Sequence, residues 1–256
     1  SVVPLDQDEG GATVVLESGM SFRSKFVVAA DGAESKLRSL AGIEAPRHDY
    51  RQRGLVAFVE SERPHQATCW QRFLPTGPLA FLPFDDGNVS SIVWTLPEAE
   101  AQRLLDVDGA TFLRELDNAF AGTLGSSVRV SRRAAFPLRL QLAQSLATGR
   151  VAVIGDAAHA VHPLAGQGVN LGLRDVATLG AMLREARQRG LDPASPHRLA
   201  RWARRQRSDN AVAAYAFDGI NRLFSNDSLA ATLVRGPLLG LAGRLPPLAH
   251  AVWCQA

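Results

Sequence analysis

One stretch decides the fold, and it reads Gly155-Asp156-Ala157-Ala158-His159-Ala160-Val161-His162-Pro163-Leu164-Ala165-Gly166-Gln167-Gly168-Val169-Asn170-Leu171-Gly172. It follows Val151-Ala152-Val153-Ile154, a short apolar run typical of a strand that is covered on both faces. It leads into a helical pattern that begins near Val169. A strand, a glycine-rich turn and a helix in this order predict a parallel α/β sheet, which binds ligands at the carboxyl ends of its strands.

Several residues of this stretch suit a nucleotide ligand. Asp156 stands at the carboxyl end of the predicted strand, where an acidic side chain can bind ribose hydroxyls. Gly166 and Gly168 allow close approach of the backbone to a ligand, and the helix after them points its unpaired N–H groups at it. One face of that helix is predicted by apolar residues at spacings of four and three, namely Val169, Leu173, Val176, Gly180 and Leu183.

The preceding residues form two regions with different hydrophobic patterns. Thr13–Glu17 and Met20–Phe26 predict a hairpin, which leads into a second buried strand, Phe26–Ala30, that stops at Asp31-Gly32. From about Tyr50 to Phe136 short alternating runs predict an antiparallel sheet inserted into the parallel one. The predicted strands there are 54–60, 68–74, 79–84, 89–96 and 128–136, the predicted helices are 98–105 and 110–120, and further helices are predicted over 196–224 and from 228 onward.

The long stretch resembles the FAD-dependent aromatic hydroxylases, and within them the ubiquinone-biosynthesis hydroxylases, through the run from His162 to Asp175. A second run, Asp31-Gly32-Ala33-Glu34-Ser35-Lys36-Leu37-Arg38, is similar to the Asp-Gly motif that this family shares between FAD and the nicotinamide donor. Similarity at 207–210 and 223–227 extends the resemblance over nearly the whole chain.

The resemblance implies a set of cofactor contacts. Asp156 would bond the ribitol or ribose region of FAD, and Pro163 would lie beside the isoalloxazine ring. Backbone N–H groups from Gly166 to Asn170 would face the N1 and C2 carbonyl edge of the flavin, while Asp31 and Arg38 would border the pyrophosphate and the donor. The implied cofactor-binding residues are Asp31, Gly32, Arg38, Gly155, Asp156, Pro163, Gly166, Gln167, Gly168, Val169 and Asn170.

The fold implied by the resemblance is α/β. It has a Rossmann-like FAD-binding domain over 1–45 and 145–190, an antiparallel β-sheet substrate domain over 46–144, and a C-terminal helical region over 191–256. No Gly-x-Gly-x-x-Gly follows a strand, although the family carries this pyrophosphate-gripping motif near its N-terminus. We therefore expect an N-terminally truncated FAD-binding domain that is inactive alone.

The implied activity is that of an FAD-dependent monooxygenase, which uses NAD(P)H and O2 to hydroxylate the aromatic ring of a polyprenylated phenol in ubiquinone biosynthesis. Halogenation or prenyl reduction on the same scaffold, or a non-catalytic remnant, are the alternatives. No general base is evident. An iron site at Asp156, His159 and His162 is a weaker hypothesis because Pro163 follows directly, so we expect no metal. Aromatic residues of the inserted sheet either line a substrate pocket or form the core, which we favour: Trp70, Phe73, Phe81, Phe84 and Trp94.

Composition and charge bear on partners and location. Two distant cysteines among 256 residues favour a reducing, cytoplasmic setting, and no apolar run reaches the roughly 18 residues of a spanning helix. A basic run at 198–207 indicates a solvated helix face more than a lipid or nucleic-acid footprint. Leucines beside arginines over 229–245 predict peripheral contact with the inner face of the membrane, or else packing on the FAD domain. A complex of ubiquinone-biosynthesis proteins is a further expected partner.

Overall fold

The computed structural model describes residues 2–161 and 168–208, and these form two compact units. The α/β unit comprises residues 2–48, 139–161 and 168–208, and the sheet unit comprises residues 49–138. The α/β class expected from the sequence is therefore confirmed. The predicted division into cofactor and substrate domains remains a proposal about function. Pro163, Gly166, Gln167 and the C-terminal leucines lie outside the described residues.

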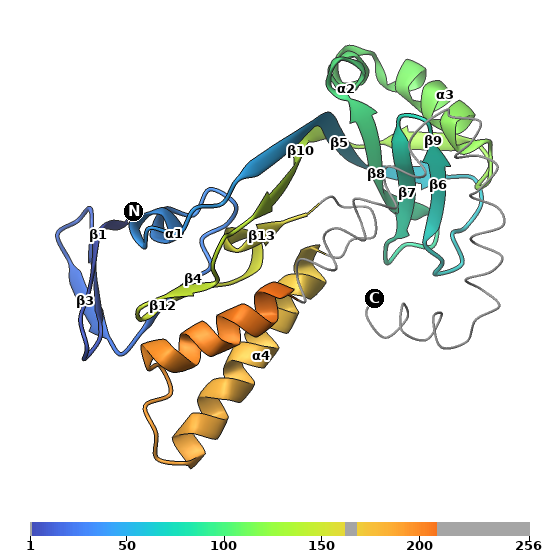
Figure 1. Ribbon diagram of the computed structural model, residues 1–256. Coiled ribbons are helices and arrows are strands. Elements are labelled where there is room, and N and C mark those ends of the chain that lie inside the picture. Colours follow the sequence, from blue (N-terminus) through green and yellow to red (C-terminus); the bar gives the residue numbers. More distant parts are fainter. Residues whose placement is uncertain (1, 162–167, 209–256) are drawn as a thin grey trace, which may run out of the picture. The chain divides into compact units, whose positions relative to one another are not determined.

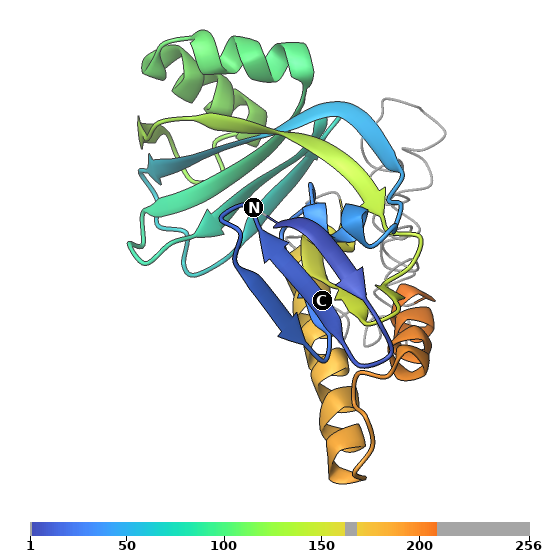
Figure 2. The ribbon, with the colours of Figure 1, turned by 90° about the vertical axis from the view of Figure 1, so that its left-hand side faces the viewer.

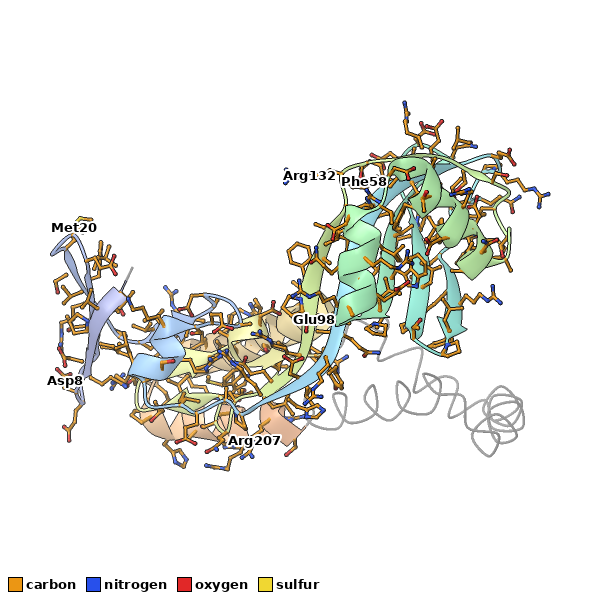
Figure 3. The ribbon with its side chains drawn as sticks, turned by 90° about the horizontal axis from the view of Figure 1, so that it is seen from above. Asp8, Met20, Phe58, Glu98, Arg132 and Arg207 are labelled. Carbon is orange, nitrogen blue, oxygen red and sulfur yellow. The ribbon has the colours of Figure 1, made fainter. Side chains whose placement is uncertain are left out.

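The α/β unit begins with a three-stranded antiparallel meander (Figure 2). Its strands are β1 (Val2–Gln7), β2 (Ala12–Leu16) and β3 (Ser21–Ser24). The predicted hairpin is confirmed, and Gly19 takes a φ of 83° in its turn. The sequence did not predict β1, because this strand is mostly exposed and contains Pro4, so it lacks the alternating apolar pattern. Asp8 and Met20 mark the two turns in Figure 3.

A small buried sheet follows in the order β11–β12–β4. It consists of β11 (Ala147–Thr148), β12 (Val151–Val153) and β4 (Val27–Ala29). Strands β12 and β4 are parallel, with Val27 opposite Val151 and Ala29 opposite Val153. Both predicted buried strands are confirmed. Because parallel strands end on the same side, the turns that follow β4 and β12 lie at one edge of this sheet.

Helices α1 (Lys36–Leu40), α4 (Gly168–Gln188) and a helix over 196–208 complete the described part of the α/β unit (Figure 1). The face of α4 that was expected to pack is wrong for its first three residues, because Val169, Leu173 and Val176 are 70%, 61% and 52% exposed. Leu183, at the end of the same predicted face, does pack against the core. The buried side chains are instead Leu171, Asp175, Leu179 and Ala186. Hydrophobic periodicity cannot detect this face, since a carboxylate bonded to the neighbouring turn stands in its middle.

In the sheet unit the antiparallel strands β5, β8, β7 and β6 follow one another in that order, β10 lies on the other side of β5, and β9 also pairs with β5. Two helices cover them, and the shared core includes Phe81, Trp94 and Phe112. The elements are β5 (Arg47–Ser61), β6 (Trp70–Leu74), β7 (Gly77–Pro83), β8 (Val89–Pro97), α2 (Glu98–Asp106), α3 (Gly109–Phe120) and β9 (Ser127–Val130).

Two expectations for this region need correction. The single strand predicted over 128–136 is two strands, β9 and β10 (Ala134–Leu142), and the end of β10 pairs with β13 (His159–Ala160) in the α/β unit. The expectation that the aromatic side chains form the core is confirmed for Phe81 and Trp94. It is wrong for Phe73 and Phe84, which are 41% and 52% exposed.

Candidate functional site

The two turns that resemble cofactor motifs follow β4 and β12 at one sheet edge. Gly32 and Gly155 both have positive φ, 85° and 59°. A Cβ added to either glycine would meet no atom within 4 Å, so the space above both turns is open. Open backbone at the carboxyl ends of parallel strands is the arrangement in which α/β sheets hold ligands.

Asp31 shapes the first turn. Its carboxylate accepts hydrogen bonds from the backbone N–H groups of Lys36 at 2.9 Å and Leu37 at 3.1 Å, and from the hydroxyl of Ser35. Burial raises the pKa of Asp31, but these hydrogen bonds outweigh burial and leave the pKa below its usual 3.8. The side chain is therefore an ionised cap for α1, and its contact with a cofactor or donor stays a prediction.

Arg38 joins the two turns. The residue is 4% exposed, and its Nη1 donates to the carbonyl oxygens of Ala33 at 3.1 Å and Ala157 at 2.8 Å. Gln141 on β10 also donates to the Ala33 carbonyl, at 3.0 Å. Burial lowers the pKa of Arg38. The arginine thus connects the first turn to Ala157, which stands 119 positions after it, and the expected contact with the pyrophosphate remains a prediction.

Asp156 is available to a ligand. It lies in the short 3-10 turn Gly155–Ala157 directly after β12, and its side chain is exposed. It makes no hydrogen bond or ion pair with any residue that the structure describes. A free carboxylate at the end of a parallel strand can accept hydrogen bonds from sugar hydroxyls.

Beneath this turn lies a polar contact that the sequence reasoning missed. Asp175 on α4 is fully buried and accepts hydrogen bonds from His159 Nε2 at 2.6 Å and from the Gly155 N–H at 2.9 Å. Gly172 precedes Asp175 by about one helical turn, and a Cβ there would come within 3.2 Å of the Gly155 Cα. An acidic residue inside the apolar pattern of α4 was the available signal.

The iron hypothesis gains no support from this geometry. His159 is buried and bonded to Asp175, whereas the Asp156 side chain is exposed, and His162 lies outside the described residues. Among residues 2–161 and 168–208, no three histidine, cysteine or acidic side chains gather as metal ligands would.

The amino end of α4 is the last described part of the predicted site. Gly168 opens the helix, a Cβ on it would meet nothing within 4 Å, and Val169 and Asn170 are exposed. The first N–H groups of a helix have no partner within it, and its dipole favours negative charge there. This end can therefore hold an electron-rich group.

Known proteins match this chain over most of its length. The FAD binding domain family matches residues 2–208. Ubiquinone hydroxylase UbiL of Rhodospirillum rubrum is 41% identical over 244 residues, which cover 95% of this chain and 57% of the relative. The 3-demethoxyubiquinol 3-hydroxylase of Escherichia coli K12 is 37% identical over 227 residues, 89% of this chain and 58% of the relative. The chain thus spans less than two thirds of either relative.

A solved structure gives the same fold. The crystal structure of p-nitrophenol 4-monooxygenase PnpA from Pseudomonas putida DLL-E4 aligns with a TM-score of 0.76 at 21% identity. The alignment covers 98% of this chain and 64% of that chain.

Proposed function

Because the chain belongs to the FAD binding domain family, and within it to the ubiquinone-biosynthesis hydroxylases, we propose that the protein is an FAD-dependent monooxygenase. It would hydroxylate the aromatic ring of a polyprenylated phenol, with NAD(P)H and O2 as co-substrates. The observation that carries this proposal is that the Asp31-Gly32 and Gly155-Asp156 turns follow two parallel, hydrogen-bonded strands, β4 and β12, at one edge of their sheet.

The described residues fit the cofactor. The open backbone at Gly32 and Gly155 leaves room for it, and the free Asp156 carboxylate suits its sugar or ribitol hydroxyls. Backbone N–H groups of Gly168, Val169 and Asn170 would favour negative charge at the amino end of α4. Pro163, Gly166 and Gln167 complete the proposed set. Bound FAD supplies the redox chemistry, and the protein supplies position and charge.

Asp156 provides the direct test. We expect Asp156→Ala to weaken FAD binding by about 1.5–3 kcal/mol, the scale of a hydrogen bond to a charged group. Titration of FAD with quenching of flavin fluorescence measures the change. Asp85→Asn, at an exposed carboxylate in the sheet unit, is the matched control and should leave affinity unchanged. Equal affinity of the Asp156 variant and the parent protein would contradict the assignment.

We also propose peripheral contact with the anionic inner face of the membrane, where a polyprenylated substrate resides. A groove of about 540 Å³ lies between α4 and the 196–208 helix, with Met182 and Trp202 among its lining residues. Arg198, Arg201 and Arg205 line it at spacings of three and four, and none forms an ion pair with a described residue. Like charges at these spacings repel, so an anion would stabilise the helix.

Vesicle flotation tests the groove. Vesicles that contain phosphatidylglycerol should carry the protein at low salt, and the triple variant Arg198→Gln/Arg201→Gln/Arg205→Gln should lose this binding. The control Arg204→Gln/Arg207→Gln changes the same helix at positions that do not line the groove. Equal flotation of both variants would show that the groove is not the membrane-binding surface. If the protein bound duplex DNA through these arginines instead of vesicles, the partner of the groove would be a nucleic acid and not a lipid. Among the described residues no helix is long and apolar enough to cross a bilayer. Assembly with other ubiquinone-biosynthesis proteins remains part of the proposal.

A further inference from the structure

We infer that His159 and Asp175 are positioning residues, a buried pair that fixes the turn presenting Asp156 and ties this turn to α4. The inference rests on the proposed function, since the purpose of the fixed turn is to hold FAD. Neither side chain is exposed to solvent, with side-chain exposures of 2% for His159 and 0% for Asp175. Neither can therefore touch the cofactor from the surface, and each acts through the turn.

The hydrogen bonds define what the pair holds. Gly155 and His159 stand at the two ends of one short segment, and both donate to the Asp175 carboxylate, at 2.9 Å and 2.6 Å. The backbone between them closes with its own bond, from the Ala158 N–H to the Gly155 carbonyl at 2.8 Å. One carboxylate thus grips both ends of a segment whose only acidic side chain, Asp156, is exposed.

The same carboxylate connects the turn to the helix. Asp175 lies about two turns after Gly168, where α4 begins. Gly172, on the turn of α4 between them, packs against Gly155 so closely that a Cβ would have to displace backbone at 3.2 Å. Any shift of the 155–159 turn must therefore move α4 or break the bonds to Asp175. Asp156 and the amino end of α4, both proposed to hold FAD, are coupled through this contact.

The polar character of the His159–Asp175 pair indicates that it positions the 155–159 turn more than it stabilises the fold. A buried carboxylate pays a large desolvation penalty, and well-packed apolar residues of similar volume are often equally stable or more so. His159 Nδ1 adds to this cost, because it is buried without a hydrogen-bond partner in the described residues. What the polar pair provides, and an apolar pair cannot, is a directed bond to the Gly155 N–H.

The test uses three variants and one control. Asp175→Asn removes the charge of the acceptor, His159→Gln replaces the imidazole donor with an amide, and His159→Gln/Asp175→Asn leaves only a neutral amide contact. Arg150→Met, at the other end of β12, is the control for a buried polar contact remote from the turn. FAD affinity, urea unfolding of the FAD-free protein, and amide hydrogen exchange over 155–160 are measured for each.

We expect each single variant to raise the Kd for FAD about tenfold, and the double variant to raise it by much less than the product of the two, about a hundredfold, because both changes disturb one contact and coupled neighbours are not additive. Exchange over 155–160 should quicken in the single variants while exchange over 27–29 changes little. Arg150→Met should lower stability and leave the Kd within about twofold.

Two results would overturn the inference: single variants that lose stability but retain the parent Kd, or exchange over 155–160 that stays unchanged. If the parent protein does not bind FAD, the proposed function fails instead, and the exchange measurement still decides whether the pair fixes the turn. If Asp175→Asn does not fold, His159→Gln and the double variant carry the same comparison.

Discussion

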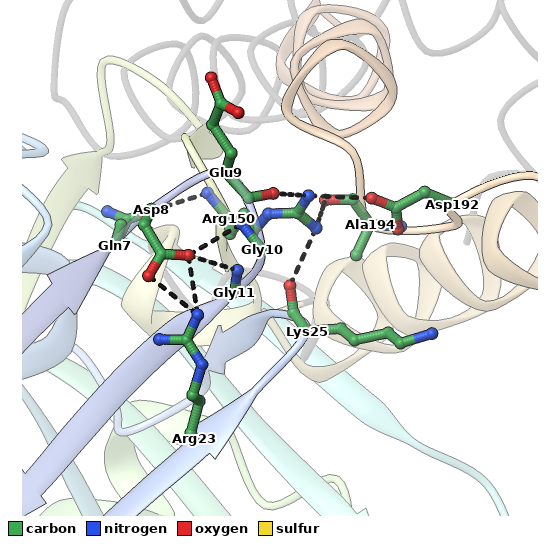
Figure 4. Close-up of polar contacts among 10 residues, drawn as sticks. All are labelled: Gln7, Asp8, Glu9, Gly10, Gly11, Arg23, Lys25, Arg150, Asp192 and Ala194. Atoms are coloured by element: carbon green, nitrogen blue, oxygen red, sulfur yellow. Dashed lines mark hydrogen bonds and ion pairs between the residues drawn. The ribbon is translucent and has the colours of Figure 1, made fainter.

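The two ends of β12 are each anchored by a buried charged side chain, yet the anchors differ in kind. Arg150 precedes the strand, and its guanidinium donates to the carbonyl oxygens of Lys25 at 3.2 Å, Ala194 at 3.4 Å and Glu9 (Figure 4). It also pairs with Asp192 at 2.9 Å. At the other end, Asp175 holds the 155–159 turn. The first anchor gathers three separate chain segments, and the second fixes one turn.

Access to water separates the two anchors. The Asp192 side chain is 40% exposed, so water can replace part of what Arg150 provides, whereas neither member of the His159–Asp175 pair reaches solvent. The glycines beside each end differ in the same way. A Cβ at Gly149 would collide with Gln7 Oε1 at 2.4 Å, but a Cβ at Gly155 would meet open space. One end of β12 is closed by the fold, and the other is open to a ligand.

The largest effect should come from Asp175→Ala. This change leaves the His159 ring and the Gly155 N–H buried without their partner, and removal of one member of a buried pair costs about 3–5 kcal/mol. Urea unfolding monitored by circular dichroism measures the loss. A cost below about 1 kcal/mol, the range of an exposed pair, would show that the two ends of β12 do not differ as described.

Arg150→Ala should cost less, about 1.5–3 kcal/mol, the scale of hydrogen bonds that involve a charged group. Its ion-pair partner Asp192 is 40% exposed, so water can reach part of the cluster. The same urea experiment applies. If Arg150→Ala lowered the free energy of unfolding by more than Asp175→Ala does, the contacts of Arg150 with three chain segments would matter more for stability than the complete burial of Asp175.

The glycines beside the two ends of β12 allow a further comparison, because their backbone conformations are nearly the same, with φ of 53° at Gly149 and 59° at Gly155. Gly155→Ala should cost only the left-handed conformation, about 1–2 kcal/mol. Gly149→Ala carries this cost and also displaces the Gln7 oxygen that accepts the Arg150 N–H at 2.6 Å. We therefore expect Gly149→Ala to lower the melting temperature more than Gly155→Ala does. Equal decreases would contradict the conclusion that Gly149 is closely packed and that Gly155 faces open space.

The smallest effect is expected at Asp192. Burial raises the pKa of Asp192, but hydrogen bonds from Ala194 and Arg150 outweigh it and hold the pKa below 3.8. Its contribution is therefore present above pH 3.8 and is lost as the pH falls through the depressed folded-state pKa. Asp192→Asn should cost about 0.2–1 kcal/mol at neutral pH. The difference from the parent chain should vanish in unfolding curves below that pKa, and a constant difference would argue against an ion pair.

Much of the architecture followed from local patterns. Buried strands were predicted at Phe26–Ala30 and Val151–Ile154 and are found at Val27–Ala29 and Val151–Val153. Most strands of the inserted sheet were predicted within a few residues of their observed bounds. Strand β1, the short pair of β10 with β13, and the packed face of α4 were not found. Strand β1 is mostly exposed and contains Pro4, so it has no alternating apolar pattern. The other two features depend on partners in separate elements, and such partners leave no periodic signal.

The sequence by itself determined the family, the order of the two motifs and the acidic residue in the turn after β12, because these are properties of adjacent residues. Only the tertiary structure decided what the polar side chains do. Asp31 caps α1, Arg38 braces the two turns, and Asp175 grips the turn between Gly155 and His159. For Arg38 and Asp175 the physical reason is that a buried charge is stable only where hydrogen-bond partners converge on it, and their partners Ala157 and His159 stand 119 and 16 positions away in the sequence.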